Sequence, residues 1–510
     1  MFKKNKVAIS VATGILGVVG VITSVQAVHI NPDGTGQVLL FPYYNGTGGY
    51  VTNINLVNST DQTKAVKIRF REGKTSHDVL DFNIYMSPED VWTGTVKNGQ
   101  DASGNWTGVL STTDRTCTLP ALASCDDGKC LAEQPFNGHN IYQGVTGADT
   151  KEGYVEVIEM GVVDDATVKQ GVLHNNGKPN NCKTVEEAWT KGTFTQGPMI
   201  INKKGVVESE NTPPKGLSAP TGGLFGSSAV INIAKGSAFA IDPIAIDNYS
   251  TQAQHYLSHD PETFLLPSLA SGNVASSSIM VRNASGEGEM VVTDWNAQAD
   301  ACLEDKDELT PRCGTNPYPI AHVLLAPHVM NEYFVDPTGG YDGHTDWVIT
   351  FPMKKHGIHQ DVVANFENGI FDREETKAGF SKPNSGFGFS PVLPGKKPDS
   401  STLNREVNVI SFKSTDPSYD DSRTVLSSYA KQSVTTGAFV SGWARLGFTG
   451  YDLKAGFKAA EAYGSTAGTY NANSNIYKGV PAVGSAFLEG NISDNPNARF
   501  GDALPHKVQR

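Results

Sequence analysis

The strongest constraint on the fold is a strict alternation of apolar and polar side chains between residues 65 and 86. Val66, Ile68 and Phe70 occupy every second position of the first run, and the next run repeats the pattern after a turn. A period of two matches a β-strand, whose successive side chains point to opposite faces. The sequence therefore predicts an antiparallel meander with one buried face. The cations on the opposite face are Lys67, Arg69 and Arg71.

Short strand-like runs continue along the chain with turn signals between them. Such a pattern favours stacked antiparallel sheets over a parallel sheet. We predict a mainly β protein with two antiparallel β-sandwich, immunoglobulin-like domains, long polar loop insertions and few short helices. The best helix candidate is 453–463, with Asp452 as N-cap. The further predicted strands are 154–160, 229–234, 238–246, 277–281, 290–295, 321–325, 347–353, 407–412, 439–448 and 480–488.

The length allows more than one hydrophobic core. We predict an N-terminal domain over 28–250 and a C-terminal domain over 251–510. Within the first, residues 98–150 are rich in Gly, Asp and Asn and hold three cysteines. This composition predicts an elaborated loop that is held by disulfides rather than packed.

Residues 1–27 have the three regions of a secretory signal peptide. Lys3, Lys4 and Lys6 precede an apolar run over 7–22, and small or tolerated residues end the segment at Ala27. We therefore expect cleavage after Ala27 and a secreted, periplasmic or cell-surface product. An uncleaved anchor is the competing interpretation, but the run of about 16 residues is shorter than the roughly 20 that a spanning helix needs. The mature chain is thus predicted to have no transmembrane anchor.

The net charge restricts the partners. The whole chain carries −12, and the leader holds three lysines and no acid, so the mature chain would carry about −15. Nucleic acids and anionic lipid surfaces require clustered positive charge. We therefore predict no nucleic-acid partner, and expect other envelope or extracellular components, polysaccharide or further copies of the chain as partners.

The six cysteines indicate an oxidising compartment. Cys302 and Cys313 flank a short charged loop and are predicted to pair. The remaining four allow three connectivities, which the sequence leaves open. Zinc is the competing interpretation, but no pair has two-residue spacing and no histidine lies near in sequence. The four open cysteines are Cys117, Cys125, Cys130 and Cys182.

One acidic stretch offers oxygen ligands for a cation. Asp336, Asp342 and Asp346 lie among glycines, and calcium prefers carboxylates in such loops. An ordinary turn is the favoured interpretation, because the twelve-residue calcium loop with its terminal glutamate is not present. Calcium is the one cofactor for which we assign candidate residues, and we assign no catalytic or cofactor-binding residues.

The most enzyme-like local pattern is His255-Tyr-Leu-Ser-His259, because histidines four apart on a helix share a face. The general-base glutamate of a metalloprotease is replaced by Tyr256, which favours a polar helix end or loop. Among the aromatic residues, Trp106 lies in polar sequence and is predicted to be exposed. The tryptophans predicted to be core or rim residues are Trp92, Trp295 and Trp347.

Several segments resemble a group of secreted bacterial proteins that are usually labelled only as cell surface or hypothetical proteins. This resemblance implies export and a β-architecture, and it brings no activity, cofactor or functional residue. The segments are 36–44 (GQVLLFPYY), 66–92 (including LDFNIYMSPEDVW), 345–352 (TDWVITFP), 407–412 and 498–510.

Two classes of function follow from these observations. The leading hypothesis is an exported, non-enzymatic protein of the cell envelope or cell surface, with a structural or adhesive role. The alternative is a secreted carbohydrate-active protein or hydrolase whose carboxylates meet only in three dimensions. A deep cleft lined by paired acids or a metal would favour the alternative.

Overall fold

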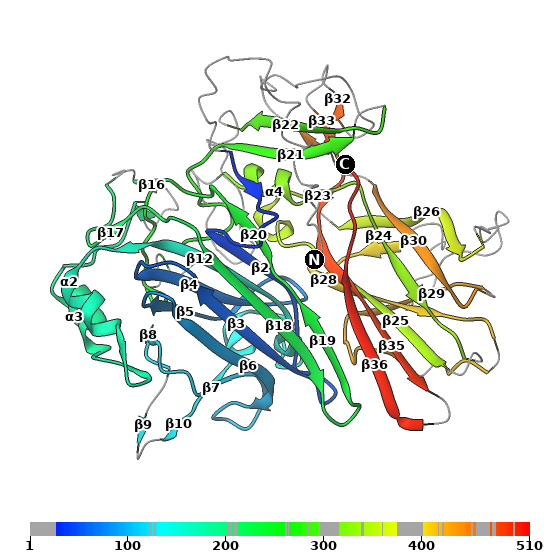
Figure 1. Cartoon of the computed structure of the whole chain (residues 1–510), viewed down its shortest axis with the longest axis horizontal. Coiled ribbons are helices and arrows are strands. Elements are labelled where there is room, and N and C mark those ends of the chain that lie inside the picture. Colours follow the sequence, from blue (N-terminus) through cyan, green and yellow to red (C-terminus); the bar gives the residue numbers. More distant parts are fainter. Residues whose placement is uncertain are drawn as a thin grey trace, which may run out of the picture.

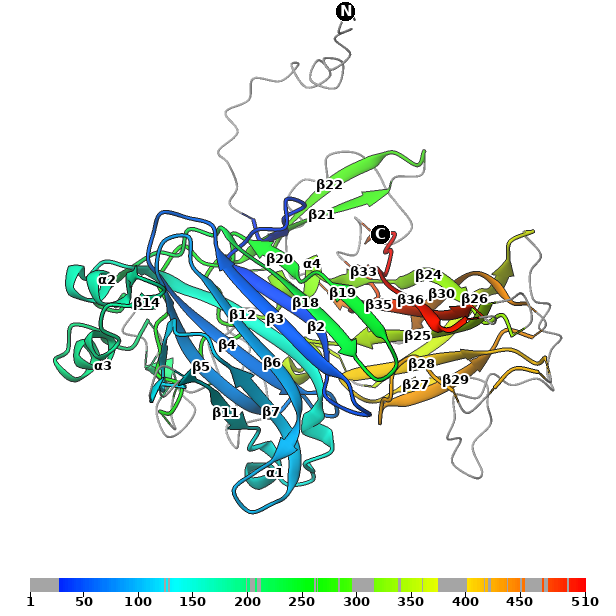
Figure 2. The ribbon, with the colours of Figure 1, turned by 60° about the horizontal axis from the view of Figure 1, so that its bottom comes forward.

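A computed structural model describes most of residues 27–510, and Figures 1 and 2 show how its elements are arranged. Two layered units lie side by side, with the N-terminal strands in one and the C-terminal strands in the other. The residues outside the description are 1–26, 123–124, 127–128, 199, 202–206, 209–211, 261–262, 264, 283–284, 296–315, 338–340, 360, 375–400, 417, 421–422, 438, 450–451, 455–469, 472–475 and 493–494.

The protein is mainly β, with 50% strand, 9% helix and several antiparallel sheets, as the alternation predicted. No described helix is both long and apolar enough to cross a membrane. The helices among the described residues are α1 (Gly138–Ile141), α2 (Ala166–Val172), α3 (Lys183–Thr190), α4 (Tyr318–Val323) and the 3₁₀ turns Asp149–Lys151 and Lys354–His356.

Two local predictions differ from the structure. The run 321–325 was predicted as a strand but falls mostly in helix α4, whose first turn contains a proline. A short apolar run has no periodicity that separates a strand from a buried helix, and proline favours helix starts. The helix candidate 453–463 begins inside strand β31 (Asp452–Lys454), and its remainder lies outside the described residues. The other predicted runs overlap strands.

The first unit consists of an eight-stranded and a six-stranded sheet. The larger sheet has the order β1-β20-β2-β12-β4-β5-β8, with β17 beside β12, and the smaller has the order β11-β7-β6-β3-β18-β19. The larger sheet's strands are β1 (His29–Ile30), β20 (Ile244–Asp247), β2 (Val38–Asn45), β12 (Glu152–Val163), β4 (Lys64–Glu72), β5 (Asp78–Met86), β8 (Cys117–Leu119) and β17 (Leu217–Ser218). The smaller sheet's strands are β11 (Ala132–Pro135), β7 (Trp106–Thr112), β6 (Val91–Gln100), β3 (Val51–Asn58), β18 (Leu224–Asn232) and β19 (Ser237–Ile241).

These two sheets share one apolar core. Ile68 and Val157 of the larger sheet pack in the same buried cluster as Ile54, Trp92 and Leu110 of the smaller sheet. The alternation in the sequence therefore places the apolar row of β4 between the sheets, as expected for stacked antiparallel sheets.

The prediction of a single buried face is wrong for this meander. Every residue of β4 is buried, and so is every residue of the neighbouring strands β2 and β12. The cationic row at Lys67, Arg69 and Arg71 is 0% exposed. The alternation distinguishes the polar face of a strand from its apolar face, but it does not show whether the polar face is exposed. Here the polar face is covered by residues that come much later in the chain.

The segment 98–150 also differs from its prediction as a loop excursion. It supplies β7 and β11 to the smaller sheet and β8 to the larger one. Leu110 and Phe136 from this segment lie in the apolar core. The polar composition comes from the turns between these strands. The residues of these turns outnumber the few apolar residues that each strand contributes.

The second unit pairs a five-stranded sheet, β29-β28-β25-β35-β36, with a four-stranded sheet, β24-β30-β26-β27. Trp347 and Ile410 of the first pack against Val329 and Leu446 of the second. The five strands are β29 (Lys431–Thr435), β28 (Val407–Lys413), β25 (Tyr341–Thr350), β35 (Val483–Ile492) and β36 (Asn495–Pro505). The four strands are β24 (His328–Phe334), β30 (Ser441–Thr449), β26 (Val362–Asp372) and β27 (Ser401–Leu403).

A third apolar core joins the two units. Leu40 and Ile158, on the outward face of the eight-stranded sheet, belong to one buried cluster with Val348, Val409 and Phe487 of the five-stranded sheet. Backbone bonds cross the junction as well, because Val407 N donates to Gly73 O at 2.8 Å. The two units thus share buried surface in addition to their own cores.

A projecting hairpin, β21 (Ser276–Arg282) and β22 (Gly288–Asp294), lies over this junction near the C-terminal end of the chain (Figures 1 and 2). Its Ile279, Val281 and Val291 pack into the third core. The remaining strands form small ladders: β9 (Cys125–Asp126), β10 (Lys129–Cys130), β13 (His174–Asn175), β14 (Lys178–Pro179), β15 (Ile200–Ile201), β16 (Val207–Glu208), β23 (Leu325–Ala326), β34 (Val480–Pro481), β31 (Asp452–Lys454), β32 (Tyr470–Asn471) and β33 (Ile476–Lys478).

Candidate functional site

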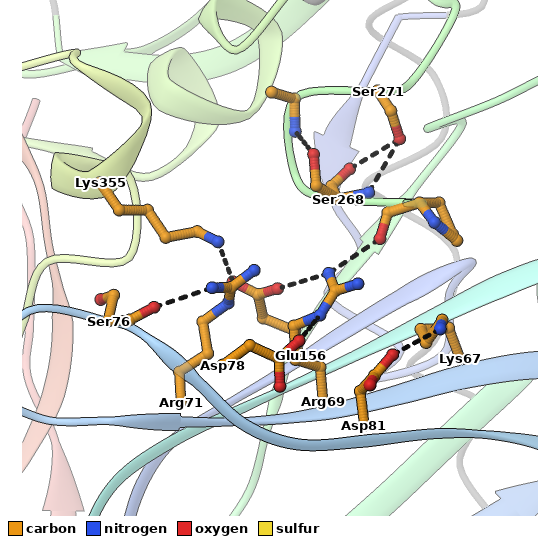
Figure 3. Close-up of polar contacts among 12 residues, drawn as sticks. Lys67, Arg69, Arg71, Ser76, Asp78, Asp81, Glu156, Ser268, Ser271 and Lys355 are labelled. Atoms are coloured by element: carbon orange, nitrogen blue, oxygen red, sulfur yellow. Dashed lines mark hydrogen bonds and ion pairs between the residues drawn. The ribbon is translucent and has the colours of Figure 1, made fainter. Parts of the chain in front are cut away.

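The most unusual chemistry in the described residues is a set of buried charges on the outward face of the eight-stranded sheet. We call it the charged layer (Figure 3). None of its side chains is more than 10% exposed. Its members are Lys67, Arg69 and Arg71 on β4, Asp78 and Asp81 on β5, Glu156 on β12 and Lys355 from the second half of the chain.

The strand register brings most of these charges together. Arg69 lies directly opposite Asp81 on one neighbouring strand and Glu156 on the other. Because β4 is the central strand of the three, its cations have carboxylates on both sides. The local alternation of β4 and the order of its neighbours are therefore enough to build the core of the layer.

Glu156 is the shared anion of the layer. Its Oε1 lies 3.0 Å from Arg71 Nε and 3.9 Å from Lys355 Nζ, and its Oε2 lies 3.6 Å from Arg69 Nη1. Lys355 follows β25 in the second unit, so this carboxylate links the two units electrostatically. Figure 3 shows Lys355 reaching toward the arginines from the opposite side.

The outer cations have partners of their own. Arg69 Nε donates to Asp78 at 2.7 Å, and Arg71 Nη1 donates to Ser76 O at 2.8 Å. Lys67 Nζ donates to Asp81 at 2.6 Å and to Ser258 at 2.7 Å. These bonds satisfy donors that would otherwise be buried at a cost of several kcal/mol per ion.

A covering segment, residues 267–271, lies over the layer. Arg69 Nη1 donates to Pro267 O at 2.9 Å, and Ser271 Oγ accepts from Ser268 N at 2.9 Å to fold the segment over the arginine. The hydroxyl of Tyr249 bonds to Ser268 O and Ser271 Oγ. The backbone that covers Arg69 is thus itself held in place by hydroxyl groups.

Burial and charge act in opposite directions on the carboxylates. Desolvation raises the pKa of Glu156, but Arg71, Lys355 and Arg69 together outweigh it and hold the pKa at about 2. Desolvation and then Asp81 raise the pKa of Asp78 to about 7, against the attraction of Arg69. Desolvation lowers the pKa of Lys67, against Asp81. Glu156 is therefore the firmly ionised anion of the layer.

This arrangement suits a structural role. An acid–base catalyst must reach its substrate, whereas these groups are buried and directed at one another. An internal ion network in which each charge has an oppositely charged neighbour within 4 Å favours one register of the elements that supply it. Within the part of the chain that the structure describes, no group of three or more His, Cys, Asp or Glu side chains is placed to hold a metal ion.

The three aspartates assigned to calcium do not lie in one loop. Asp342 and Asp346 are both on strand β25, and four residues of strand span about 13 Å. Asp342 forms an ion pair with Arg423 and a hydrogen bond of 3.0 Å with His344 Nε2, while Asp346 accepts a bond from Leu426 N at 2.7 Å. The stretch from Tyr341 onward is extended, so Asp342 and Asp346 do not share one coordination sphere. The third residue, Asp336, precedes the undescribed positions 338–340.

One disulfide joins Cys117 to Cys182 and resolves part of the open connectivity. It ties β8 of the larger sheet to the residue before α3. Cys125 and Cys130 are opposite each other in the β9–β10 backbone register. The predicted bond between Cys302 and Cys313 lies outside the described residues.

The histidine pattern at 255–259 forms no metal site. His255 is buried and its Nε2 lies 2.9 Å from the Tyr85 hydroxyl, whereas His259 is exposed. Desolvation, then Lys67, lowers the pKa of His255 to about 3, so it stays neutral. The tryptophan predictions are confirmed, because Trp106 is 56% exposed and the other three are buried: Trp92, Trp295 and Trp347.

The sequence pattern identified the cations of the charged layer on β4 but predicted that they are exposed to solvent. It missed Lys355 and the covering segment altogether, because both are distant in sequence. A signal for their burial was present in the neighbouring strands, which carry acidic residues that can pair with these cations. Asp81 and Glu156 each lie between apolar residues of those strands.

The comparisons with known proteins add no relative: no protein-family model, curated protein or solved structure matches the chain.

Proposed function

We propose that the chain is an exported, non-enzymatic protein of the cell envelope or cell surface, with a structural or adhesive role. The observation that carries the proposal is the junction of the two units, where an apolar core and the charged layer are buried together. Such a junction favours a rigid body over two domains that move apart, because inter-domain motion is expected unless the interface is large and apolar.

Export is supported by the leader pattern at residues 1–27 and by the Cys117–Cys182 disulfide, a bond that persists in oxidising compartments. We further propose that the two layered units are immunoglobulin-like sandwich domains divided near residue 250. The hydrolase alternative is less well supported. It needs paired carboxylates at a cavity, and the two cavities discussed below have at most one acidic side chain in their lining.

Fractionation of cells that express the full chain tests the proposal. We expect the protein in the periplasmic, surface or medium fraction, with an N-terminus at Val28 by mass spectrometry. A matched variant, Leu16→Arg, breaks the apolar run of the leader and should keep the full-length chain in the cytoplasm. A wild-type protein found only in the cytoplasm would contradict export, and hydrolysis of polysaccharides by the purified protein would contradict the non-enzymatic role.

A further inference from the structure

A cavity of about 610 Å³ lies between the β21–β22 hairpin and the last four residues of the chain. Its volume falls within the roughly 300 to 1,000 Å³ typical of small-molecule sites. Figure 1 places the C-terminal end beside β21, and Figure 2 shows the hairpin standing away from the body. The lining residues that matter for its chemistry are Met280, Arg282, Met330, Lys507, Val508 and Arg510.

The charge of this cavity is opposite to that of the protein. Its lining contains three basic side chains and no acidic one, although the chain carries a net charge of −12. Arg282 and Lys507 are exposed at the mouth. Arg510 is already engaged, because its guanidinium donates to Val323 O and Leu325 O at 2.7 and 2.6 Å. Arg282 Nη1 donates to Gly286 O at 3.0 Å, so its other N–H groups and the Lys507 ammonium remain to meet an anion.

A backbone donor adds to these cations. On its outer edge, β21 uses the amides of Ser278 and Arg282, which donate to Val28 O and Arg510 O. Since alternate residues of a strand direct their amides to the same edge, the amide of Met280 faces the gap between these two bonds. An anionic head group here would meet two side-chain cations and one N–H group.

Apart from Gln509, the other side chains of the lining are apolar. Met280 is 57% exposed, and Met330 and Val508 continue the apolar surface. Methionine side chains are flexible and adapt to apolar ligands of different shape. Val508 and Arg510 also line a second cavity of about 220 Å³, whose lining includes the apolar Leu324 and Val329 as well as Asp242 and His506. Val508 therefore belongs to both cavities.

We propose that this cavity binds an anionic amphiphile, a molecule with one carboxylate-like head and an unbranched apolar tail. The head lies at Arg282, Lys507 and the Met280 amide, and the tail lies along Met280, Met330 and Val508. The inference is independent of the proposed function, because it rests on the cavity alone.

Calorimetric titration of the mature protein with octanoate tests the head and the tail separately. Octanoate should bind saturably. Acetate lacks the tail and 1-octanol lacks the charge, so each should bind about tenfold or more weakly. Equal affinity for octanoate and 1-octanol would overturn the role of the cations, and equal affinity for octanoate and acetate would overturn the role of the apolar wall.

Two pairs of matched variants locate the site. The double variant Arg282→Gln/Lys507→Gln should weaken octanoate binding about tenfold, whereas Lys178→Gln/Lys215→Gln makes the same charge change at exposed lysines elsewhere and should not.

Met280→Ser should weaken binding more than Met290→Ser, because the two methionines are cross-strand partners and are each 57% exposed, but only Met280 lines the cavity. All four variants change exposed residues, so unchanged melting curves will show that folding is intact. Equal effects within either pair would overturn the assignment.

A last measurement separates a free amphiphile from a membrane surface. Sedimentation with phosphatidylglycerol vesicles should leave the protein in the supernatant. Binding to the vesicles without saturable binding of octanoate would overturn the proposal.

Discussion

The charged layer and a second ionic cluster, in the second unit, have similar composition but different surroundings. In the second, which we call the Arg423 cluster, Glu489 lies 3.1 Å from Arg423 and 3.6 Å from Arg499, and Arg423 also pairs with Asp342. Glu489 is buried, but the other three side chains are 22 to 35% exposed. In the charged layer, Glu156 also joins two arginines, and all three side chains are at most 1% exposed.

This difference decides what each network contributes. A buried ion that loses its partner has no water to replace it, and the cost is about 3 to 5 kcal/mol. A partly exposed ion that loses its partner is resolvated and screened by salt, and the cost is about 1 kcal/mol or less. The comparison therefore predicts a graded series of stability effects for chemically similar substitutions.

The largest effect is expected for Glu156→Gln. This change keeps the shape of the side chain but removes the charge that Arg71, Arg69 and Lys355 share, so the free energy of unfolding should fall by about 3 to 5 kcal/mol. Urea denaturation followed by both fluorescence and circular dichroism measures the loss. A loss below about 1 kcal/mol would show that the layer behaves like a surface cluster, and the comparison would fail.

The acid dependence of the same variant sharpens the contrast. The folded pKa of Glu156, about 2, lies below the ordinary value of 4.5, so its stabilising effect is full above pH 4.5 and is lost as the pH falls toward 2. The stability difference between wild type and Glu156→Gln should therefore shrink as the pH falls from 4.5, whereas it should be constant from pH 5 to 7. A difference that stays constant below pH 4.5 would contradict the assignment of Glu156 as the ionised anion.

Buried histidines add a further pH dependence to the free energy of unfolding, which the wild type and the Glu156→Gln variant share. Desolvation, the largest cause, lowers the pKa values of His255, His322 and His506 to about 3. Unfolding lets each bind a proton below pH 6.5, so the stability they support is present above that pH and falls between pH 6.5 and 3. The effect of Glu156 is the difference between the stability–pH curves of the wild type and the Glu156→Gln variant. The loss due to the histidines is the same in both curves and cancels in this difference.

The sequence predicted the strands of the fold better than it predicted their surroundings. Val66, Ile68 and Phe70 determine their own burial, because a period of two identifies one face of a strand. The period does not determine what covers the other face. A row of cations that is exposed to solvent would have the same sequence pattern as the buried row of Lys67, Arg69 and Arg71. The cover comes from Lys355 and the backbone around Pro267, which no local pattern connects to β4.

Outside the charged layer, the predictions that depended on local sequence alone agreed with the structure, and those that depended on sheet pairing did not. Trp106 and the paired cysteines follow from local composition, since polar surroundings predict exposure and an even cysteine count predicts disulfides. The aspartates at 342 and 346 show the opposite case. Their spacing suggested a loop, but the apolar residues from Trp347 onward extend strand β25 back through them, so sheet pairing overrode the local turn signal.

A smaller effect is expected for Arg423→Gln in the Arg423 cluster. The variant should lower the free energy of unfolding by about 1 kcal/mol, because Glu489 keeps Arg499 and Ser237 as partners and Asp342 keeps His344. The loss should also diminish at high salt, since these groups are partly exposed. The same urea experiment at low and high salt measures both. A salt-independent loss as large as that of Glu156→Gln would remove the distinction between the two clusters.

The smallest effect is expected at a fully solvated pair, which sets the baseline of the series. Lys191 and Glu187 lie four residues apart at the end of α3 and form an ion pair of 2.6 Å, with side chains 68 and 53% exposed. Helix-surface pairs of this kind contribute little, because both side chains stay solvated and are screened by salt. Lys191→Gln should therefore lower the free energy of unfolding less than Arg423→Gln does, although its ion pair is shorter than any that Glu156 makes. If the losses at Glu156 and Lys191 followed ion-pair distance instead of burial, Lys191→Gln would rank above Glu156→Gln, so these two variants separate the two explanations most directly.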